Sequence, residues 1–273
     1  VSPMCGIVGY IGRRDDVAPL LLEGLQRLEY RGYDSAGIAI HGKSGSKSTG
    51  LKSVKAKGRV RDLEARVPAR FKGSVGIAHT RWATHGAPND ENAHPHLDAD
   101  SKVAVVHNGI FDNASDLRAR LTADGVAFLS ETDTEVLAHL IGRSEADTLE
   151  GKVREAVGQI EGTYGVAVLH ADFPDRIVVA RNGSPVVLGI GEKEMFVALH
   201  HRGLAHLRHA HHRGGARGGG RPGPAGQIPH RLPLGRGDRL VPDRGGGGRG
   251  RPDPVDLGHL QPHPGEDGER RHR

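Results

Sequence analysis

The amino-acid composition changes abruptly near Leu199, and this break limits how much of the chain can fold. The 74 residues from 200 to 273 contain 18 glycines, 14 arginines, 10 histidines and 9 prolines, but no lysine, serine, threonine, asparagine or aromatic residue. A segment of this kind buries too little apolar surface to offset the entropy lost when it becomes ordered. We therefore expect a folded part at residues 4–198 and a disordered tail, rich in Gly, Arg, His and Pro, at residues 199–273.

The net charge of +5 comes from this tail. Residues 1–199 carry 24 Lys and Arg against 26 Asp and Glu, a net charge of −2, whereas residues 200–273 carry 14 against 7, a net charge of +7. The loss of Lys, Ser, Thr and aromatic residues is typical of a GC-rich gene read out of frame, so we expect a frameshift close to Ala198. The alternative is an Arg/Gly-rich segment that binds nucleic acid. Such segments usually interleave aromatic residues, so no nucleic-acid partner is expected.

The cellular compartment is predicted from the cysteine count and from the apolar runs. Cys5 is the only cysteine, which excludes an intramolecular disulfide and fits a reducing compartment. No run of 18 apolar residues predicts a membrane-spanning helix, and the first residues lack the basic and apolar regions of a signal peptide. We expect a cytoplasmic protein with no membrane partner.

Strand signals in the folded part occur in hairpin-like groups, and helix signals occur in pairs. Short apolar runs predict strands at residues 5–12, 35–40, 74–83, 102–111, 163–172, 176–183 and 185–191, and another that begins at 195. Apolar residues at helical spacing predict helices at 17–30, 114–125, 133–142 and 149–160, with Gly125 and Gly142 as C-caps. This grouping predicts an α+β fold with antiparallel sheets rather than a βαβ repeat.

Cys5 is a candidate nucleophile because of its position just before the first strand. A thiol attacks as the thiolate, and an ordinary cysteine needs a base to form one. When a nucleophile is the first residue, its own α-amine can serve as that base. Met4 precedes Cys5, so removal of an initiator methionine would expose this amine. The alternative from position alone is a small, buried core cysteine.

Six motifs in order resemble one family of enzymes. They are MCGIVGYIG, LEYRGYDSAGIAI, GIAHTRWATHG, NAHPH, VVHNGI and SETDTEVLAHL. Together they closely resemble the glutaminase domain of class II glutamine amidotransferases, from Met4 to about Ala198. The strings RGYDSAG, TRWATHG and SETDTE are similar to the hexosamine branch, the glutamine–fructose-6-phosphate aminotransferases, rather than to the other branches. The resemblance implies an N-terminal-nucleophile hydrolase fold, a four-layer αββα sandwich.

The same resemblance implies the chemistry and its catalytic residues. Cys5 would attack the side-chain amide of L-glutamine, giving a γ-glutamyl thioester and ammonia, and water would then release glutamate. Asn108 and the backbone N–H of Gly109 would form the oxyanion hole. For the isolated dipeptide, an Asn-Gly hairpin turn is the alternative.

Further positions are expected to bind the substrate. Arg81 would hold the α-carboxylate of glutamine, and a surface ion pair is the alternative. Asp133 would bind the α-ammonium, although Thr132 or Asp133 could instead cap the following helix. Trp82, together with Thr84 and His85 of the same loop, would shape the glutamine pocket, and packing is the alternative for the indole.

Supporting roles are expected near the site. Arg31 would assist the thiol electrostatically or form a structural ion pair, Gly32 would permit close approach of the backbone, and His94 and His96 would brace loops. The sequence has no second cysteine and no HExxH pattern, so neither a metal nor another cofactor is expected.

The sequence departs from the family at both ends. Val1, Ser2 and Pro3 precede Met4, and we expect Met4 to be the true initiator, with a cleaved propeptide as the less favoured alternative. Family members continue into two sugar-isomerase domains, which are absent here. Relatives dimerise largely through those domains, so a monomer is expected. The alternatives for function are an inactive truncated relic and a glutaminase module of another class II amidotransferase.

Overall fold

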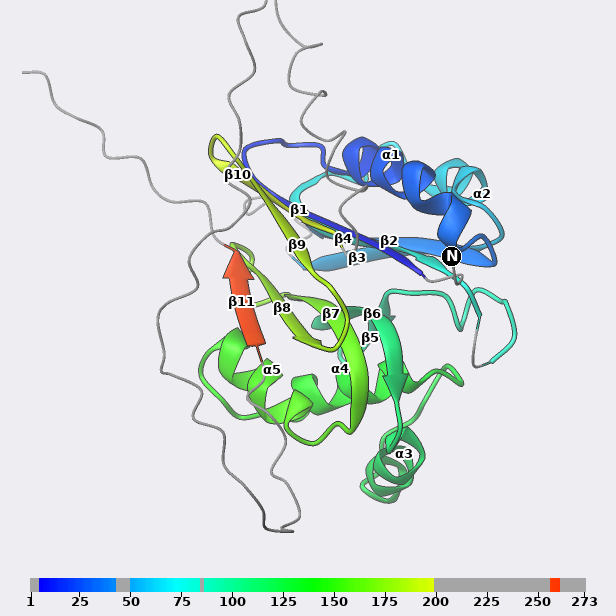
Figure 1. Cartoon of the computed structure of the whole chain (residues 1–273), viewed down its shortest axis with the longest axis vertical. Helices are drawn as coiled ribbons and strands as arrows, with labels where there is room; N and C mark the ends of the chain where they lie inside the picture. The colour runs from blue at the N-terminus through cyan, green and yellow to red at the C-terminus, as the bar shows by residue number, and fades with distance from the viewer. Residues whose placement is uncertain (1–4, 43–49, 84–85, 199–255, 261–273) are drawn as a thin grey trace, which may run out of the picture.

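Two β-sheets lie face to face at the centre of the molecule, and helices cover their outer faces (Figure 1). The computed structural model describes residues 5–42, 50–83, 86–198 and 256–260. The helices are α1 (Ala18–Leu28), α2 (Val60–Arg66), α3 (Ala114–Ala123), α4 (Asp133–Arg143) and α5 (Leu149–Val157), with a short 3₁₀ turn η1 (Glu29–Arg31). The strands are β1 (Gly6–Ile11), β2 (Ser35–Gly42), β3 (Leu51–Lys57), β4 (Gly73–Arg81), β5 (His96–Leu97), β6 (Val103–Phe111), β7 (Gly162–His170), β8 (Ile177–Asn182), β9 (Val187–Gly191), β10 (Glu194–Ala198) and β11 (Asp256–Leu260).

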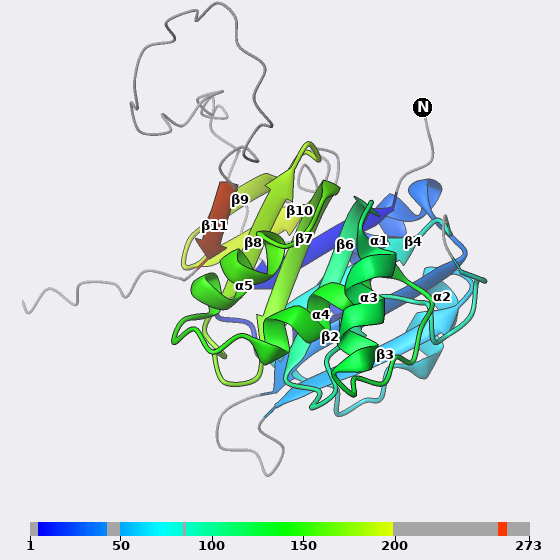
Figure 2. The same cartoon turned by 90° about the horizontal axis from the view of Figure 1, so that it is seen from below.

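Every strand pair in the two sheets is antiparallel within the described residues. The first sheet has the order β3-β2-β4-β1-β10-β9, and the second has the order β11-β8-β7-β6-β5. Helices α1 and α2 cover the first sheet, whereas α4 and α5 pack on the second and α3 packs on α4 (Figure 2). The prediction of an α+β, four-layer αββα sandwich is therefore confirmed.

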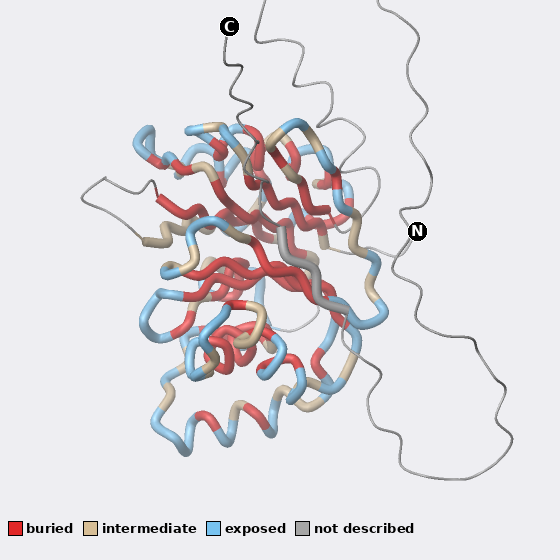
Figure 3. Tube along the Cα trace, turned by 90° about the vertical axis from the view of Figure 1, so that its left-hand side faces the viewer, coloured by how far each residue is buried: buried red, intermediate tan, exposed pale blue. Residues whose placement is uncertain are grey.

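Apolar side chains form one core between each pair of layers. Leu21 and Leu25 of α1 pack with Ile38 on the outer face of the first sheet. Ile77 and Val106 belong to the core between the two sheets. A third core lies between the second sheet and its helices. The central strands are therefore buried on both faces (Figure 3), which explains their long apolar runs and fixes how the sheets stack.

Two glycines expected to end helices have different roles. Gly125 follows α3 with φ +86°, the left-handed conformation that ends a helix. Gly142 lies inside α4, so its prediction as a C-cap is wrong. A Cβ atom there would lie 2.5 Å from Oδ2 of Asp98. Glycine at this position lets the helix pack closely against the segment that follows β5.

One segment of the expected disordered tail differs from that expectation. Residues Asp256–Leu260 form β11, which pairs antiparallel with β8, with Asp256 opposite Arg181 and Leu260 opposite Ile177. Without β11, strand β8 would be an edge of the second sheet with unpaired backbone groups, and such an edge accepts an added strand. Composition alone missed this pairing because backbone hydrogen bonds carry it. The other tail residues lie outside the described part of the chain.

Candidate active site

Cys5 is held at the start of β1 by the pairing of β1 with β4. Gly6 lies opposite Thr80, and its backbone N–H donates to Thr80 Oγ1 over 3.2 Å. This register brings Cys5 beside the end of β4. The backbone N–H of Trp82 donates to the Cys5 Sγ atom over 3.2 Å, and the thiol contacts the Trp82 carbonyl oxygen at 3.7 Å.

The surroundings of the thiol act on its pKa in opposite directions. Burial raises the pKa of Cys5, whereas the Trp82 hydrogen bond and the positive charges of Arg81 and Arg31 lower it. Burial dominates, so the pKa lies above its usual value. At neutral pH the side chain is a thiol, and attack on a substrate requires a base.

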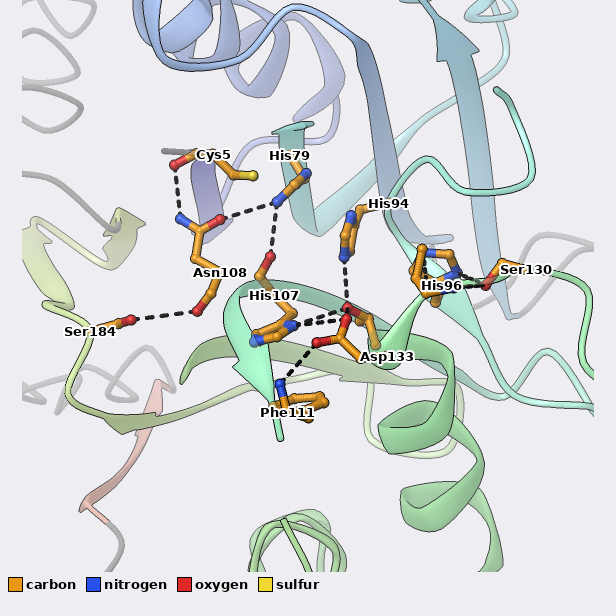
Figure 4. A network of polar contacts seen from close by, with 12 residues as sticks. Cys5, His79, His94, His96, His107, Asn108, Phe111, Ser130, Asp133 and Ser184 are labelled. Atoms are coloured by element: carbon orange, nitrogen blue, oxygen red, sulfur yellow. Dashed lines mark hydrogen bonds and ion pairs between the residues drawn. The ribbon is translucent and has the colours of Figure 1, made fainter. Parts of the chain in front are cut away.

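Asn108 reaches Cys5 from the second sheet, near the end of β6. Its Nδ2 atom donates to the Cys5 carbonyl oxygen over 2.8 Å, and the Asn108 side chain is buried. The backbone oxygen of Asn108 accepts a long hydrogen bond from Ser184 Oγ, at 3.5 Å. Asn108 thus joins the two sheets at the thiol (Figure 4).

Gly109 follows Asn108 in a conformation that other residues rarely adopt. Its φ angle is +139°, and a Cβ atom would lie 1.9 Å from the carbonyl oxygen of Thr163 on β7. No side chain fits there. Asn108 and Gly109 do not form a tight hairpin turn, because β6 continues to Phe111 and stays paired with β7.

Arg81 and Trp82 border the thiol from the first sheet. The Arg81 guanidinium donates to the carbonyl oxygens of Ala87 at 3.3 Å and Gly86 at 3.4 Å, so it braces the chain beyond the loop. Burial lowers the Arg81 pKa, while Cys5 and nearby carboxylates oppose that shift. The Trp82 ring meets Tyr33 edge to face, with 5.3 Å between ring centroids. Trp82 therefore combines packing with a place at the site.

Asp133 opens α4 and faces β6. Its Oδ2 accepts from the Phe111 backbone N–H over 3.0 Å, and its Oδ1 accepts from Thr134 Oγ1 over 3.3 Å. Thr132 occupies the N-cap position but makes no side-chain cap bond. Its hydroxyl instead lies 3.0 Å from His96 Nε2. Neither Thr132 nor Asp133 therefore caps α4 with its side chain as the sequence alternative predicted: Thr132 contacts His96, and Asp133 accepts from Phe111 and Thr134.

The other residues expected at the site are Gly32, Arg31, His94, Thr84 and His85. A Cβ atom on Gly32 would lie 2.7 Å from the Arg81 carbonyl carbon, so glycine lets η1 approach β4. Arg31 is buried beside it. His94 is buried, and its Nε2 lies 2.9 Å from Thr134 Oγ1. Thr84 and His85 lie outside the described residues.

Sequence reasoning did not assign Thr134 or His107 to the site. The His107 Nδ1 atom lies 3.0 Å from Thr134 Oγ1, which also contacts His94. Because a hydroxyl has one proton, and Thr134 donates it to Asp133, both rings donate to Thr134. Burial holds the His94 pKa well below its usual value, so this ring stays neutral. Thr134 is the second threonine of the motif SETDTE, but only the fold shows that it faces His94 and His107.

These groups surround a single cavity of about 290 Å³. The thiol of Cys5, the amide of Asn108, the cation of Arg81 and the anion of Asp133 line it. The imidazoles of His94 and His107 also line the cavity, together with apolar side chains and hydroxyl groups. A cavity of this size fits a small molecule with both charges. Within the described part of the chain, no cluster of three His, Cys, Asp or Glu residues could hold a metal ion.

Comparison with known proteins agrees with this geometry. Residues 79–205 match the family model described as a glutamine amidotransferase domain. The chain is 52% identical over 203 residues to the glutamine–fructose-6-phosphate aminotransferase (isomerizing) of Chlorobaculum tepidum, a match that covers 71% of this chain and 32% of that protein. The corresponding enzyme of Thermus thermophilus is 52% identical over 196 residues, covering 71% of this chain and 31% of the relative. The chain therefore spans about a third of the length of the curated relatives it matches.

Solved structures show the same architecture. The glutamine phosphoribosylpyrophosphate amidotransferase of B. subtilis, complexed with ADP and GMP, superimposes with a TM-score of 0.64 at 27% identity, covering 75% of this chain and 44% of that one. A structure described as the allosteric regulatory enzyme of purine biosynthesis gives a TM-score of 0.64 at 29% identity, covering 75% of this chain and 43% of that one.

The stacked antiparallel sheets, with a cysteine at the start of the first strand, define an amidotransferase of the N-terminal-nucleophile type. The chain contains a glutamine amidotransferase domain, as the matched family model and the relatives show. Its resemblance to the glutaminase domain of glutamine–fructose-6-phosphate aminotransferases is likewise confirmed. Among the described residues, no helix is long and apolar enough to cross a membrane.

Proposed function

We propose that residues 4–198 hydrolyse the side-chain amide of L-glutamine to glutamate and ammonia. The single observation that carries this proposal is the cavity in which the Cys5 thiol lies beside the Asn108 amide, with Arg81 and Asp133 also among its lining residues. Free glutamine carries an α-carboxylate, an α-ammonium and an uncharged carboxamide. The cation and the anion of the cavity complement its two charges, which leaves the carboxamide for the thiol.

The proposed reaction passes through a thioester. The Cys5 Sγ atom attacks the carboxamide carbon of glutamine, and the carbonyl oxygen becomes an oxyanion. The Asn108 Nδ2–H and the Gly109 N–H stabilise that charge. The C–N bond then breaks, and ammonia leaves after it takes up a proton. Water attacks the thioester, and glutamate and the free thiol are released.

The base in this proposal is the α-amine of Cys5. Burial keeps the Cys5 pKa above its usual value, so a proton must be removed before attack. The described groups that contact the sulfur are the backbone N–H and carbonyl oxygen of Trp82, and the charges that act on its pKa are those of Arg81 and Arg31; none of these groups is a base. The α-amine serves if residues 1–4 are absent from the active protein, as we propose.

The wider role proposed here follows from the relatives. Their printed names describe an isomerizing aminotransferase that acts on fructose 6-phosphate. We infer that the ammonia supports amino-sugar synthesis in the cytoplasm when sugar-isomerase domains are present. The chain described here would release ammonia into solution, without a cofactor and without requiring a nucleic acid. We also propose that residues 199–273 arise from an out-of-frame reading.

The test is a glutaminase assay of the full chain and of a chain that begins at Cys5, each beside its Cys5→Ala variant. Glutamate release above the variant supports the proposal, and acid-quenched mass spectrometry should then detect a glutamyl adduct on Cys5. If the folded chain that begins at Cys5 releases no more glutamate than its variant, the protein is the inactive relic.

A further inference from the structure

The orientation of the Asn108 carboxamide decides whether it can serve an oxyanion. An asparagine amide has one end that donates and one that accepts. Only the end carrying hydrogen stabilises negative charge. In the structure Nδ2 donates to the Cys5 carbonyl oxygen over 2.8 Å. Among the described residues this is its only acceptor, so the second N–H remains for a ligand.

The opposite end of the Asn108 amide is held by His79 on β4. The His79 Nε2 atom lies 3.3 Å from Asn108 Oδ1 and 3.0 Å from the His107 carbonyl oxygen (Figure 4). A backbone carbonyl has no proton to give, so the proton of this shared contact must lie on Nε2. His79 therefore presents a donor to the amide, and a reversed amide would place two donors against each other.

His79 has no other protonation state or tautomer that would allow the Asn108 amide to reverse. The residue is fully buried, and its Nδ1 atom has no hydrogen-bond partner among the described groups. Burial lowers the His79 pKa to about 3, against the opposing effect of its hydrogen bonds to Asn108 and His107. The ring is therefore neutral in any ordinary buffer, with the proton on Nε2. The His94 ring packs against it, with centroids 4.1 Å apart.

The strand period explains why a histidine at this position reaches the site. Successive side chains of β4 alternate between the two faces of the sheet. Val75 and Ile77 belong to the core between the sheets, so His79 and Arg81 face the second sheet as well. One strand thus supplies both the guanidinium beside the cavity and the ring that holds Asn108.

We propose that His79 is a positioning residue, which fixes the Asn108 carboxamide with its N–H groups toward Cys5 and the substrate oxygen. This inference rests on the proposed function for its catalytic consequence. The structural part of the inference is one tautomer of His79 and one orientation of the Asn108 amide, and it does not depend on whether the protein hydrolyses glutamine.

The test compares His79→Gln with His79→Met in the active form of the protein. The terminal nitrogen of glutamine and the terminal methyl of methionine both lie four bonds from Cα, as Nε2 does in histidine, but only glutamine restores a donor. We expect His79→Met to lower kcat about 10- to 100-fold, approaching the loss of an oxyanion donor. His79→Gln should retain at least about a third of kcat, and KM for glutamine should stay within about twofold in both, because other residues bind its charges.

Equal loss of kcat in the two variants at similar thermal stability would overturn the inference, as would a loss confined to KM. A wild-type protein without glutaminase activity would instead defeat the proposed function. In that case, and also if the variants do not fold, ¹⁵N NMR of the wild-type His79 ring decides the inference. We expect protonated Nε2 and unprotonated Nδ1 from pH 5 to 9, and a proton on Nδ1 would refute it.

Discussion

The backbone N–H of Trp82 donates to the sulfur of Cys5 across 3.2 Å, although 77 positions separate the two residues in the chain. This bond ties the nucleophile to the end of β4, whose Arg81 borders the same cavity. The thiol is therefore positioned by the backbone of a neighbouring strand, and its location depends on the β1–β4 register.

Extending the N-terminus should abolish activity. A chain that begins at Cys5 has an α-amine with a pKa near ~7.7–8.0, and the unprotonated amine is the active form. Its kcat/KM should therefore rise with pH through this range and level off above it. A chain that retains residues 1–4 lacks the amine and should fall below about 1% of that rate. Steady-state assays between pH 6 and 9 measure the pH dependence and the difference in rate between the two chains. Equal activity of the two chains would exclude the amine as base.

Gly109→Ala should destabilise the fold as well as the site. The added Cβ would lie 1.9 Å from the Thr163 carbonyl oxygen at a φ angle of +139°, so we expect a loss of at least ~2 kcal/mol in the free energy of unfolding. Gly125→Ala is the matched control, because Gly125 also has a positive φ, of +86°, but no atom lies within 4 Å of the added Cβ. Its loss should be about 1 kcal/mol. Urea unfolding distinguishes these outcomes, and equal losses would contradict the steric explanation.

Asp133→Asn should weaken glutamine binding without disrupting the structure. The amide oxygen of asparagine can still accept from the Phe111 N–H, which Asp133 now does over 3.0 Å, but the negative charge for an α-ammonium is lost. We expect KM to rise roughly 30-fold or more, with kcat within about threefold. The control is Asp172→Asn on the surface, where the carboxylate pairs with Lys102 at 3.4 Å and is largely exposed. A rise in KM of the same size in this control would contradict the assignment.

Glu135 should make the stability of the fold depend on pH. Burial alone would raise its pKa, but contacts from His139, the Leu129 N–H and Ser130 together lower it to about 2. Because the folded pKa is depressed, this stabilisation is present above about pH 4.5 and is lost as the pH falls toward 2. Its full size is about 3 kcal/mol.

Glu135→Gln should therefore lower the free energy of unfolding at pH 7, and the difference from wild type should shrink between pH 4.5 and 2. Glu64→Gln is the control: this glutamate on α2 is exposed, and among the described groups its carboxylate accepts only from Gln26, at 3.3 Å. Denaturant unfolding across this pH range provides the measurement. A constant difference between Glu135→Gln and wild type would argue against the depressed pKa.

Much of the fold could be predicted because its signals are local. Apolar periodicity located most of the strands and helices, and six ordered motifs indicated the family. The periodicity did not predict the short helix α2 or the two-residue strand β5. Two other errors involve contacts between distant segments. Gly142 looked like a helix end, but close packing against Asp98 keeps it inside α4. The strand at 256–260 depends on the free edge of β8 rather than on its own composition.

The sequence indicated the charged and reactive groups of the candidate site, and only some of its supporting ones. Cys5, Arg81 and Asp133 belong to distinctive motifs, and the structure places all three around one cavity. Thr134 and His79 lie in the same motifs as Asp133 and Arg81, but their roles were not predicted, because a buried threonine or histidine is recognisable only by the groups that it faces. Sheet stacking brings those groups together, and no sequence spacing encodes it directly.

The division of the site between the two sheets has a consequence for the cell's nitrogen supply. Cys5 and Arg81 belong to one sheet, whereas Asn108 and Asp133 come from the other sheet and its helix. A chain in which the two sheets do not stack keeps the two pairs apart, so we expect it not to deamidate glutamine. Misfolded copies of such an enzyme would then be inactive, and they would not consume glutamine, an amino acid that many syntheses share.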